Sequence, residues 1–210
     1  MIDLEEAQSP VANQGDRRTC TGFAVAASHD WMGGEDGLRS AEDVIWAARQ
    51  VRAGHSDAVS VQAALNGLEI NEHASESAWP YGIPHWSSGR PAAALESANR
   101  RALPQWRRLT ASSFESIREE LASGNAVLFT VGIVHKAWQE PGAMIDAPPG
   151  EKVPGYHAVL VVGSSEEGEQ VEVLKIKNSW GPNWGRGGYA LLSRNYVETY
   201  GLCAHAMEVG

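Results

Sequence analysis

Three residues whose side chains together support nucleophilic catalysis occur in order along the chain: Cys20, His157 and Asn178. Cys20 precedes an Ala-rich apolar run and is expected where a helix begins. There the unpaired N–H groups and the positive end of the helix dipole favour a thiolate. A thiolate nucleophile needs an imidazole partner, and the imidazole needs a third group that fixes its tautomer. His157 opens an apolar strand and Asn178 ends the next, so neighbouring strands would place them side by side.

Each of these residues taken alone has an ordinary structural explanation. A cysteine before an apolar helix is usually a small core residue. A histidine at the end of a strand is usually a structural residue whose ring nitrogens are hydrogen-bonded. The sequence segments around these residues favour a catalytic role instead. These segments are Asn13-Gln14-Gly15 before Cys20, then Gly155-Tyr156-His157-Ala158-Val159, and finally Lys177-Asn178-Ser179-Trp180-Gly181-Pro182-Asn183-Trp184-Gly185-Arg186-Gly187-Gly188-Tyr189.

The three segments closely resemble, in order, the active-site segments of the papain-like cysteine peptidases. The histidine follows the cysteine by 137 residues and the asparagine follows the histidine by 21, a spacing similar to that of the family. The resemblance covers roughly Pro10 to Tyr189, and Trp79-Pro80-Tyr81 and Ser60-Val61 resemble bacterial members. It implies an α+β, two-lobed papain-like fold, with an N-terminal helical lobe, a C-terminal β-barrel-like lobe and the active-site cleft between them.

The same resemblance implies a role for each site residue. Cys20 would be the nucleophile and His157 its general base and acid. Asn178 would orient the imidazole, and Trp180 would shield that hydrogen bond from water. The side-chain amide of Gln14 and the backbone N–H of Cys20 would form the oxyanion hole. The side-chain chemistry agrees, since one amide oxygen can accept the imidazole N–H and a second amide can donate to an oxyanion.

The chain departs from the family pattern at several positions near this site. Arg17 stands where the family usually has a cysteine, so the family's disulfide is lost. Thr21 replaces a bulky aromatic residue, and Tyr156 replaces the Asp or Asn often found before the histidine. The glycine pair that lines substrate subsites in many members is not evident near Ala58-Val59. The substrate preference of well-known members is therefore not carried over to this chain.

The stretch before the nucleophile bears on how the enzyme would be controlled. Met1 lies only 19 residues before Cys20, too few to fold over the cleft as a separate inhibitory domain. We therefore expect the chain as given to be active without proteolytic processing. If it is not, an inhibitory partner chain has to be considered.

The elements that would position these residues are helical in the first half. Helix-capping patterns and apolar spacing predict helices at four places. One starts at Thr19 or Cys20. A second starts at Ser40, with Val44, Ala47, Ala48 and Val51 on one face. A third, short one covers Ser60 to Leu65 and is stopped by Asn66-Gly67; the fourth starts at Ser112-Ser113, with Phe114, Ile117 and Leu121 at helical spacing.

The second half reads as strands. Runs of β-branched or alternating residues bounded by Gly and Pro predict strands at Ala126–Val134, His157–Val162, Val171–Lys177 and Gly188–Leu192. The Pro-, Gly-, Ser- and Trp-rich stretch Glu76–Pro104 is predicted to be loop and to cross between the halves. We therefore expect one peptidase domain over 1–210, with a helical lobe over about 10–104 and a β-rich lobe over about 105–205.

Composition and charge exclude several other classes of protein. The chain has 210 residues and a formal net charge of −9, which disfavours nucleic acid as a partner. It has no apolar run long enough for a membrane helix and no signal peptide, so a reducing cytoplasm is expected, with secretion not excluded. A bond between Cys20 and Cys203 has no support from spacing. Cys203-Ala204-His205 makes a poor zinc site, and no metal or cofactor is expected.

Taken together, the motifs predict a cysteine peptidase that hydrolyses peptide bonds of a peptide or protein substrate through an acyl-enzyme on Cys20. An acyl transferase, peptide ligase or peptide-maturation enzyme would use the same thioester and the same residues. The third alternative is a catalytically idle peptide-binding module. The intact set Cys20, His157, Asn178 and Gln14 argues against an idle site.

Overall fold

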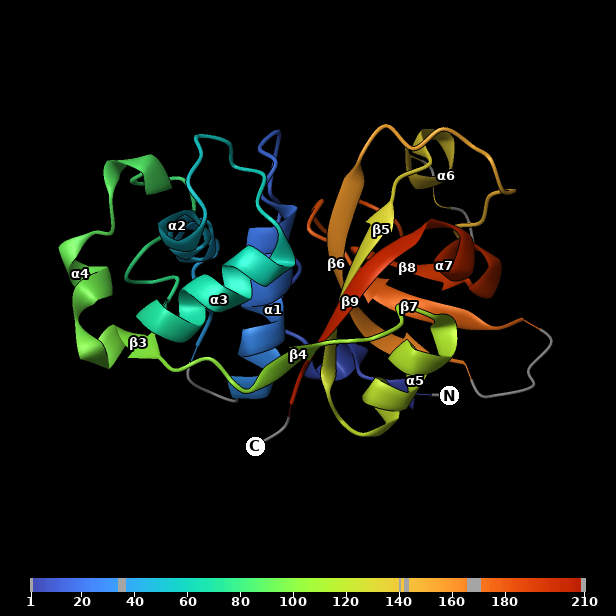
Figure 1. Ribbon diagram of the computed structural model, residues 1–210, viewed down its shortest axis with the longest axis horizontal. Helices are drawn as coiled ribbons and strands as arrows, with labels where there is room; N and C mark the ends of the chain where they lie inside the picture. Colours follow the sequence, from blue (N-terminus) through green and yellow to red (C-terminus); the bar gives the residue numbers. More distant parts are fainter. Residues whose placement is uncertain (1, 34–36, 140, 142–143, 166–170, 209–210) are drawn as a thin grey trace.

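The computed structural model describes residues 2–33, 37–139, 141, 144–165 and 171–208, and it has a helical half and a sheet half that pack side by side (Figure 1). The α+β class, with helices first and strands second, is as predicted. The α-helices are α1 (Cys20–Gly33), α2 (Ala41–Val51), α3 (Val61–Asn71), α4 (Ala92–Leu95), α5 (Phe114–Ala122), α6 (His135–Gln139) and α7 (Arg194–Tyr200). Short 3-10 helices cover Glu5–Ala7, Trp86–Ser88 and Ser97–Asn99.

Serine side chains cap the starts of several of these helices. The Ser40 hydroxyl accepts a hydrogen bond from the Asp43 N–H at 3.2 Å. Ser60 caps α3 and Ser113 caps α5 in the same way. Each cap satisfies one of the N–H groups that a helix start leaves unpaired, so these predicted starts are confirmed.

The prediction that Asn66-Gly67 stops the third helix is wrong. Helix α3 continues through both residues to Asn71. Gly67 lies where α3 crosses α2, and a Cβ atom on it would collide with the Ala47 carbonyl group. The glycine therefore allows two helices to approach closely, and tertiary packing outweighs its weak helix propensity.

The sheet half is built around one antiparallel sheet with the strand order β4-β9-β5-β6-β7-β8, and β1 pairs with β6. The path is open, since β4 and β8 end it without pairing with each other among the described residues, so the expected barrel-like lobe is not a closed barrel. A separate hairpin joins β2 and β3. The strands are β1 (Ile2–Asp3), β2 (His73–Ala74), β3 (Arg100–Arg101), β4 (Trp106–Arg108), β5 (Ala126–Gly132), β6 (Tyr156–Ser164), β7 (Val173–Lys177), β8 (Tyr189–Ser193) and β9 (Gly201–Met207).

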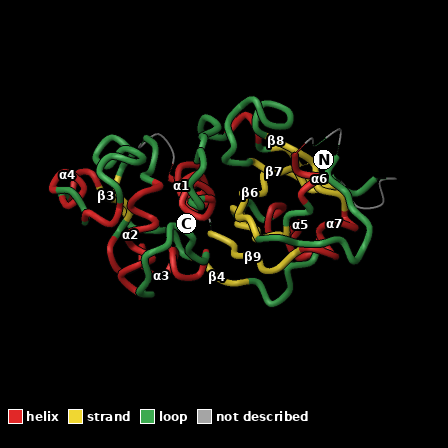
Figure 2. Tube along the Cα trace, turned by 90° about the horizontal axis from the view of Figure 1, so that it is seen from above, coloured by secondary structure: helices red, strands yellow, loops and turns green. Residues whose placement is uncertain are grey.

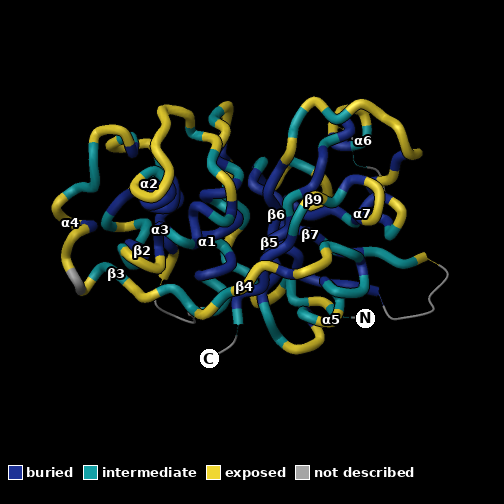
Figure 3. The backbone as a smooth tube through the Cα atoms, viewed as in Figure 1, coloured by how far each residue is buried: buried dark blue, intermediate teal, exposed yellow. Residues whose placement is uncertain are grey.

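The two central strands, β5 and β6, are buried on both faces (Figure 3). Alternate residues point to opposite faces of a strand. Phe129 and Val159 pack into a core shared with α5 and α7. Leu128 and Leu160 pack into a second core shared with α1, α2 and α3. The two halves are therefore held together by a common apolar core.

The segment Glu76–Pro104 does not lie where the sequence predicted it. It does not cross between the halves but folds back on the helical half, where Trp79, Trp86 and Ala94 form a small core with Ile45. The β2–β3 hairpin closes this segment, and the chain then passes from the helical half to the sheet half between β3 and β4. No helix among the described residues is long and apolar enough to cross a membrane.

Candidate active site

The predicted nucleophile and its predicted base come from the two halves of the molecule. Cys20 is the first residue of α1, and His157 is the second residue of β6. Helix α1 packs against β6 where the halves meet (Figures 1 and 2). Both residues line a cleft of about 1210 Å³ whose walls come from both halves. Gln14 and Trp180 line the same cleft.

The Cys20 thiol interacts with His157 across the cleft. Burial by itself raises the pKa of this thiol, but the interaction with His157 outweighs burial and leaves the pKa below its usual value. Backbone N–H groups of Ala158 and Thr21 act in the same direction. The position at the start of α1 adds the helix dipole. The site therefore favours the thiolate form of Cys20.

Asn178 fixes the tautomer of His157. Its Oδ1 lies 2.6 Å from Nε2 of His157 and also accepts the backbone N–H of Ser179 at 2.8 Å. Because the Ser179 N–H can only donate, the atom facing both groups is the amide oxygen, and the proton of His157 sits on Nε2. Nδ1 is then free to exchange a proton with the thiol. Asn178 itself is 3% exposed and lines a small cavity next to the cleft.

Gln14 is held by three hydrogen bonds that leave one N–H unused. Its Oε1 accepts from the Ser179 hydroxyl at 2.7 Å, and its Nε2 donates to the Arg17 carbonyl at 2.7 Å. Its backbone N–H donates to the Ser179 carbonyl at 2.8 Å. A side-chain amide nitrogen carries two protons, so the second one can donate to an anion in the cleft. The bonds of Gln14 therefore leave one amide proton available on a residue that lines the cleft.

Aromatic rings cover the imidazole. The ring centroid of Trp180 lies 4.8 Å from that of His157, and the edge of Trp138 meets the same ring at 5.6 Å. Trp138 is 1% exposed and donates its indole N–H to the Tyr196 hydroxyl at 2.7 Å. Rings at these distances exclude water from the bond between His157 and Asn178, which strengthens it.

Two residues of this arrangement were not assigned by sequence reasoning. Ser179 lies inside the Asn178-Ser179-Trp180 segment, so the motif contained it, but its bond to Gln14 joins positions 165 residues apart. Trp138 lies in no motif that was recognised, and only packing reveals it. The rest of the expected set, Cys20, His157, Asn178, Gln14 and Trp180, is brought together around one cleft.

Neither a disulfide bond nor a cluster of metal ligands is found in the part of the chain that the structure describes. Both cysteines are free thiols. No three His, Cys, Asp or Glu side chains within the described ranges gather to hold a metal ion. His205, from the weak Cys203-Ala204-His205 pattern, instead faces the Gln62 amide at 3.3 Å.

We expect iodoacetamide at pH 6 to 7 to alkylate Cys20 at least about tenfold faster than Cys203, because only the first lies at a helix start beside an imidazole. Mass spectrometry of timed digests measures both rates in one sample. Cys203 is an internal control, since it lines the same cleft. Equal rates at the two positions would remove the argument for an activated thiol.

Comparison with known proteins places this arrangement in a family. The model of the papain family cysteine proteases matches residues 5–209. A probable cysteine protease of Arabidopsis thaliana, RDL3, is 47% identical over 53 residues, which is 25% of this chain and 14% of that protein. The digestive cysteine proteinase 2 of Homarus americanus is 25% identical over 219 residues, 95% of this chain and 62% of that protein.

The chain thus spans less than two thirds of the length of either relative. Among solved structures, xylellain, a cysteine protease from Xylella fastidiosa, superposes with a TM-score of 0.84 at 20% identity, over 100% of this chain and 85% of that one. That likeness confirms the two-lobed papain-like fold. With the family model covering nearly the whole chain, the protein belongs to the papain family of cysteine proteases.

Proposed function

We propose that the protein hydrolyses peptide bonds through an acyl-enzyme on Cys20, with His157 as general base and acid. The observation that carries this proposal is that a hydrogen bond from Asn178 holds the His157 ring on the cleft that Cys20 also lines, where His157 lowers the pKa of the Cys20 thiol. Together with the unused N–H of Gln14 on the same cleft, it provides a nucleophile, a proton carrier and an oxyanion donor.

In the first half of the reaction, the Cys20 thiolate attacks the carbonyl carbon of the substrate. The electron pair of the C=O bond moves to the oxygen, whose negative charge is stabilised by the side chain of Gln14 and the backbone N–H of Cys20. His157 then gives its proton to the leaving amine nitrogen, the C–N bond breaks, and a thioester remains.

In the second half, a water molecule attacks the thioester. His157 takes a proton from that water, the C–S bond breaks, and the acid product leaves. The thiolate and the imidazolium are then restored. Both halves use the same oxyanion position, so one amide donor serves two transition states.

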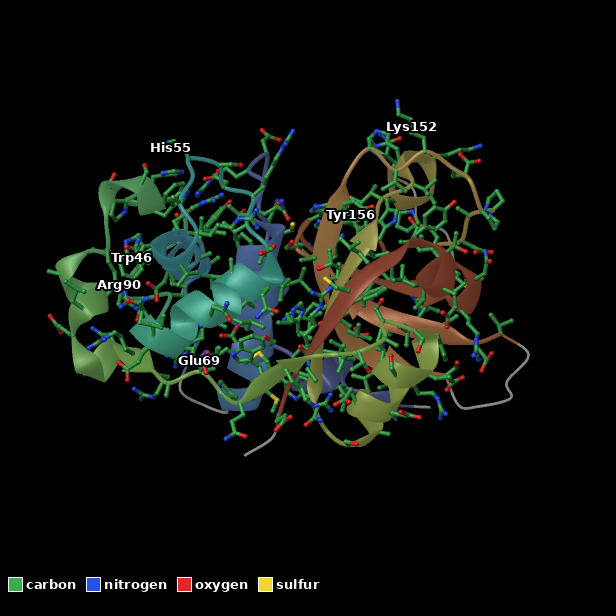
Figure 4. All side chains as sticks on the ribbon, in the orientation of Figure 1. Trp46, His55, Glu69, Arg90, Lys152 and Tyr156 are labelled. Carbon is green, nitrogen blue, oxygen red and sulfur yellow. The ribbon has the colours of Figure 1, made fainter. Side chains whose placement is uncertain are left out.

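Two features of the cleft support a peptide as the substrate. The cleft, at about 1210 Å³, is large enough for several residues of an extended chain. Tyr156, the residue before His157, is 58% exposed and lies at the start of β6, beside the junction of the halves (Figure 4). An exposed aromatic ring on the cleft, beside the residue proposed as general base, suits packing against a substrate.

The two halves act as one domain in this proposal, because the core around Leu128 and Leu160 is shared by helices and strands. We also propose a reducing compartment such as the cytoplasm as the site of action. A free thiol at Cys20 is the required state, and oxidation of a reactive thiolate would block the nucleophile.

Incubation with a mixed peptide library, followed by sequencing of the product ends, tests the proposal. We expect new free carboxyl and amino termini with the wild-type protein and none with Cys20→Ala. Adding a short peptide with a free amino terminus separates hydrolysis from transfer, because a transferase would yield the ligated peptide in preference to the acid. A folded wild-type protein that produces neither acid nor ligated peptide would contradict the proposal and favour an idle binding module.

A further inference from the structure

The Trp79-Pro80-Tyr81 stretch carries a hydroxyl group that takes no part in the bond-breaking steps described above. The Tyr81 Oη donates to the backbone carbonyl of Gln14 at 2.8 Å and lies 2.7 Å from the Thr19 hydroxyl. These two partners lie 67 and 62 residues before Tyr81 in the chain. One oxygen atom therefore bridges the residue that carries the proposed oxyanion amide and the residue next to the nucleophile.

The direction of both hydrogen bonds follows from the atoms that meet. A carbonyl oxygen can only accept, so the single phenolic proton of Tyr81 goes to Gln14. The Thr19 hydroxyl then donates its own proton to the Tyr81 oxygen. Thr19 is 0% exposed, and a buried hydroxyl without a partner costs stability. The bond to Tyr81 therefore helps to fix where Thr19 lies.

Three contacts hold Tyr81 itself in place. The Cζ atom of Arg17 lies 4.8 Å from the centroid of the phenol ring, over its face. The ring of Phe23, from α1, meets the phenol edge-on with the two ring centroids 4.7 Å apart. The backbone N–H of Tyr81 donates to the Glu76 carboxylate at 2.8 Å. A side chain that is locked by its own packing can fix the groups bonded to it.

The two groups proposed as oxyanion donors lie at the two ends of the segment that Tyr81 bridges. One is the side-chain amide of Gln14, and the other is the backbone N–H of Cys20, which follows Thr19. Residues 15–18 between them form an irregular, largely exposed turn that belongs to no helix or strand. No ladder of backbone hydrogen bonds therefore sets the separation of the two donors. Such donors are effective when their positions are fixed before the reaction.

We propose that Tyr81 is a positioning residue, whose hydroxyl fixes the separation between the Gln14 amide and the Cys20 N–H so that both reach one substrate oxygen. The assignment rests on the proposed peptidase function. Tyr81 is not among the described residues that line the cleft, so it acts through Gln14 and Thr19. Its contribution is distinct from that of Arg17, whose carbonyl holds the side chain of Gln14, whereas Tyr81 holds the backbone.

Tyr81→Phe removes the bridging oxygen and keeps the ring that contacts Arg17 and Phe23. On a peptide that the wild type cleaves, we expect kcat to fall about tenfold and KM to stay within about twofold. The oxyanion charge develops only near the transition state, and the Gln14 amide is still present but less well placed. Alkylation of Cys20 by iodoacetamide forms no oxyanion, so its rate should stay within about twofold of the wild-type rate.

A double-mutant cycle with Gln14→Ala separates positioning from a general structural effect. Once the amide is gone its position no longer matters, so Tyr81→Phe should then lower kcat no more than about twofold. Tyr200→Phe is the matched control, because the Tyr200 hydroxyl likewise donates to a carbonyl, that of Pro148, and accepts the Glu151 N–H at 3.2 Å. Its loss should lower the Tm and leave kcat unchanged, when kcat is measured where all variants are folded.

Full turnover in Tyr81→Phe, or the same fractional loss of kcat with and without the Gln14 amide, would overturn the proposal. A parallel fall in kcat and in the alkylation rate of Cys20 would also overturn it, because the damage would then lie at the nucleophile.

A peptide nitrile provides a readout without turnover. The Cys20 thiol adds across the C≡N bond, so that a C–S bond forms, the proton goes to the nitrogen, and this nitrogen takes the place of the substrate oxygen. We expect the Kd of the nitrile to rise about tenfold in Tyr81→Phe. Adduct formation without peptide hydrolysis in the wild type would refute the proposed function alone. An unchanged Kd in Tyr81→Phe would refute the role of Tyr81 alone.

Discussion

Replacing Gln14 with alanine is expected to lower kcat on the order of 10²–10³-fold and to change KM little. The charge on the substrate oxygen exists fully only near the tetrahedral intermediate, so the lost hydrogen bond acts on the transition state and not on the bound substrate. The two bonds that hold the amide, from the Ser179 hydroxyl and to the Arg17 carbonyl, fix the remaining N–H in advance. Steady-state kinetics on a peptide cleaved by the wild type measure the effect.

The matched control for this prediction is Asn178→Ala, which removes an amide that acts one step further from the substrate. It leaves the nucleophile and the oxyanion donor in place, and loosens the ring of His157. We expect a smaller loss of kcat and a change in the pH profile, because the thiolate–imidazolium pair is less well held. Full turnover in a normally folded Gln14→Ala protein would show that the Asn13-Gln14-Gly15 segment is only structural.

Sequence motifs were sufficient to choose the residues of the candidate site, because each of these residues lies within a short, recognisable segment of the chain. Asn178 and His157 could be placed together by reasoning about the ends of neighbouring strands, and β6 and β7 are indeed paired. The bonds that hold Gln14 could not be found in this way. Ser179 reaches it across 165 positions, and no periodicity encodes such a contact.

The same limit applies to the fold. Strands β5, β6, β7 and β8 were predicted within a few residues because β-branched runs between glycines identify buried strands. Strand β9 was missed, since Gly201–Met207 contains no β-branched residue and its burial depends on β4 and β5. The end of α3 was misplaced because the reason for Gly67 lies on another helix.

Arg17 shows how a departure from a family pattern gains a structural explanation. The sequence indicated only that a disulfide cysteine was lost at this position. In the structure, the guanidinium of Arg17 binds the carboxylates of Glu42 and Asp57. It also stacks over Tyr81, with its Cζ atom 4.8 Å from the centroid of the ring. The carbonyl of the same residue accepts the Gln14 amide. An ionic cross-link therefore holds the short segment that carries both the oxyanion donor and the nucleophile.

Replacing Arg17 with alanine is expected to lower the free energy of unfolding by about 3 kcal/mol and the Tm by roughly 10 °C. Glu42 is 0% exposed and would keep only the backbone N–H groups of Gly82 and Trp86 as donors. A buried carboxylate that loses its cation is strongly destabilising. We expect kcat to fall as well, because the backbone carbonyl at position 17, which accepts the Gln14 amide, is no longer held in place by the ionic cross-link. Thermal unfolding and kinetics at a temperature where the variant is folded measure the two effects separately.

The pH dependence of this loss gives a second, independent check. Although partial burial raises the pKa of Asp57, hydrogen bonds from Arg17 and Trp86 lower it to about 2. A carboxyl whose pKa is lowered on folding stabilises the protein above its unfolded pKa, near 4, and this contribution is lost as the pH falls toward 2. The difference in Tm between wild type and Arg17→Ala should therefore be largest above pH 4 and shrink below it.

Two variants control for a general effect of losing an arginine. Arg107→Ala breaks ion pairs of a half-exposed arginine and should cost no more than about 1 kcal/mol. The double variant Arg17→Ala with Glu42→Gln removes the buried charge along with its partner and should recover part of the stability lost by Arg17→Ala alone. If Arg17→Ala unfolds within about 1 kcal/mol of the wild type and the double variant is no better, the ionic cross-link does not hold the segment. The position of the Gln14 amide would then not depend on the side chain of Arg17.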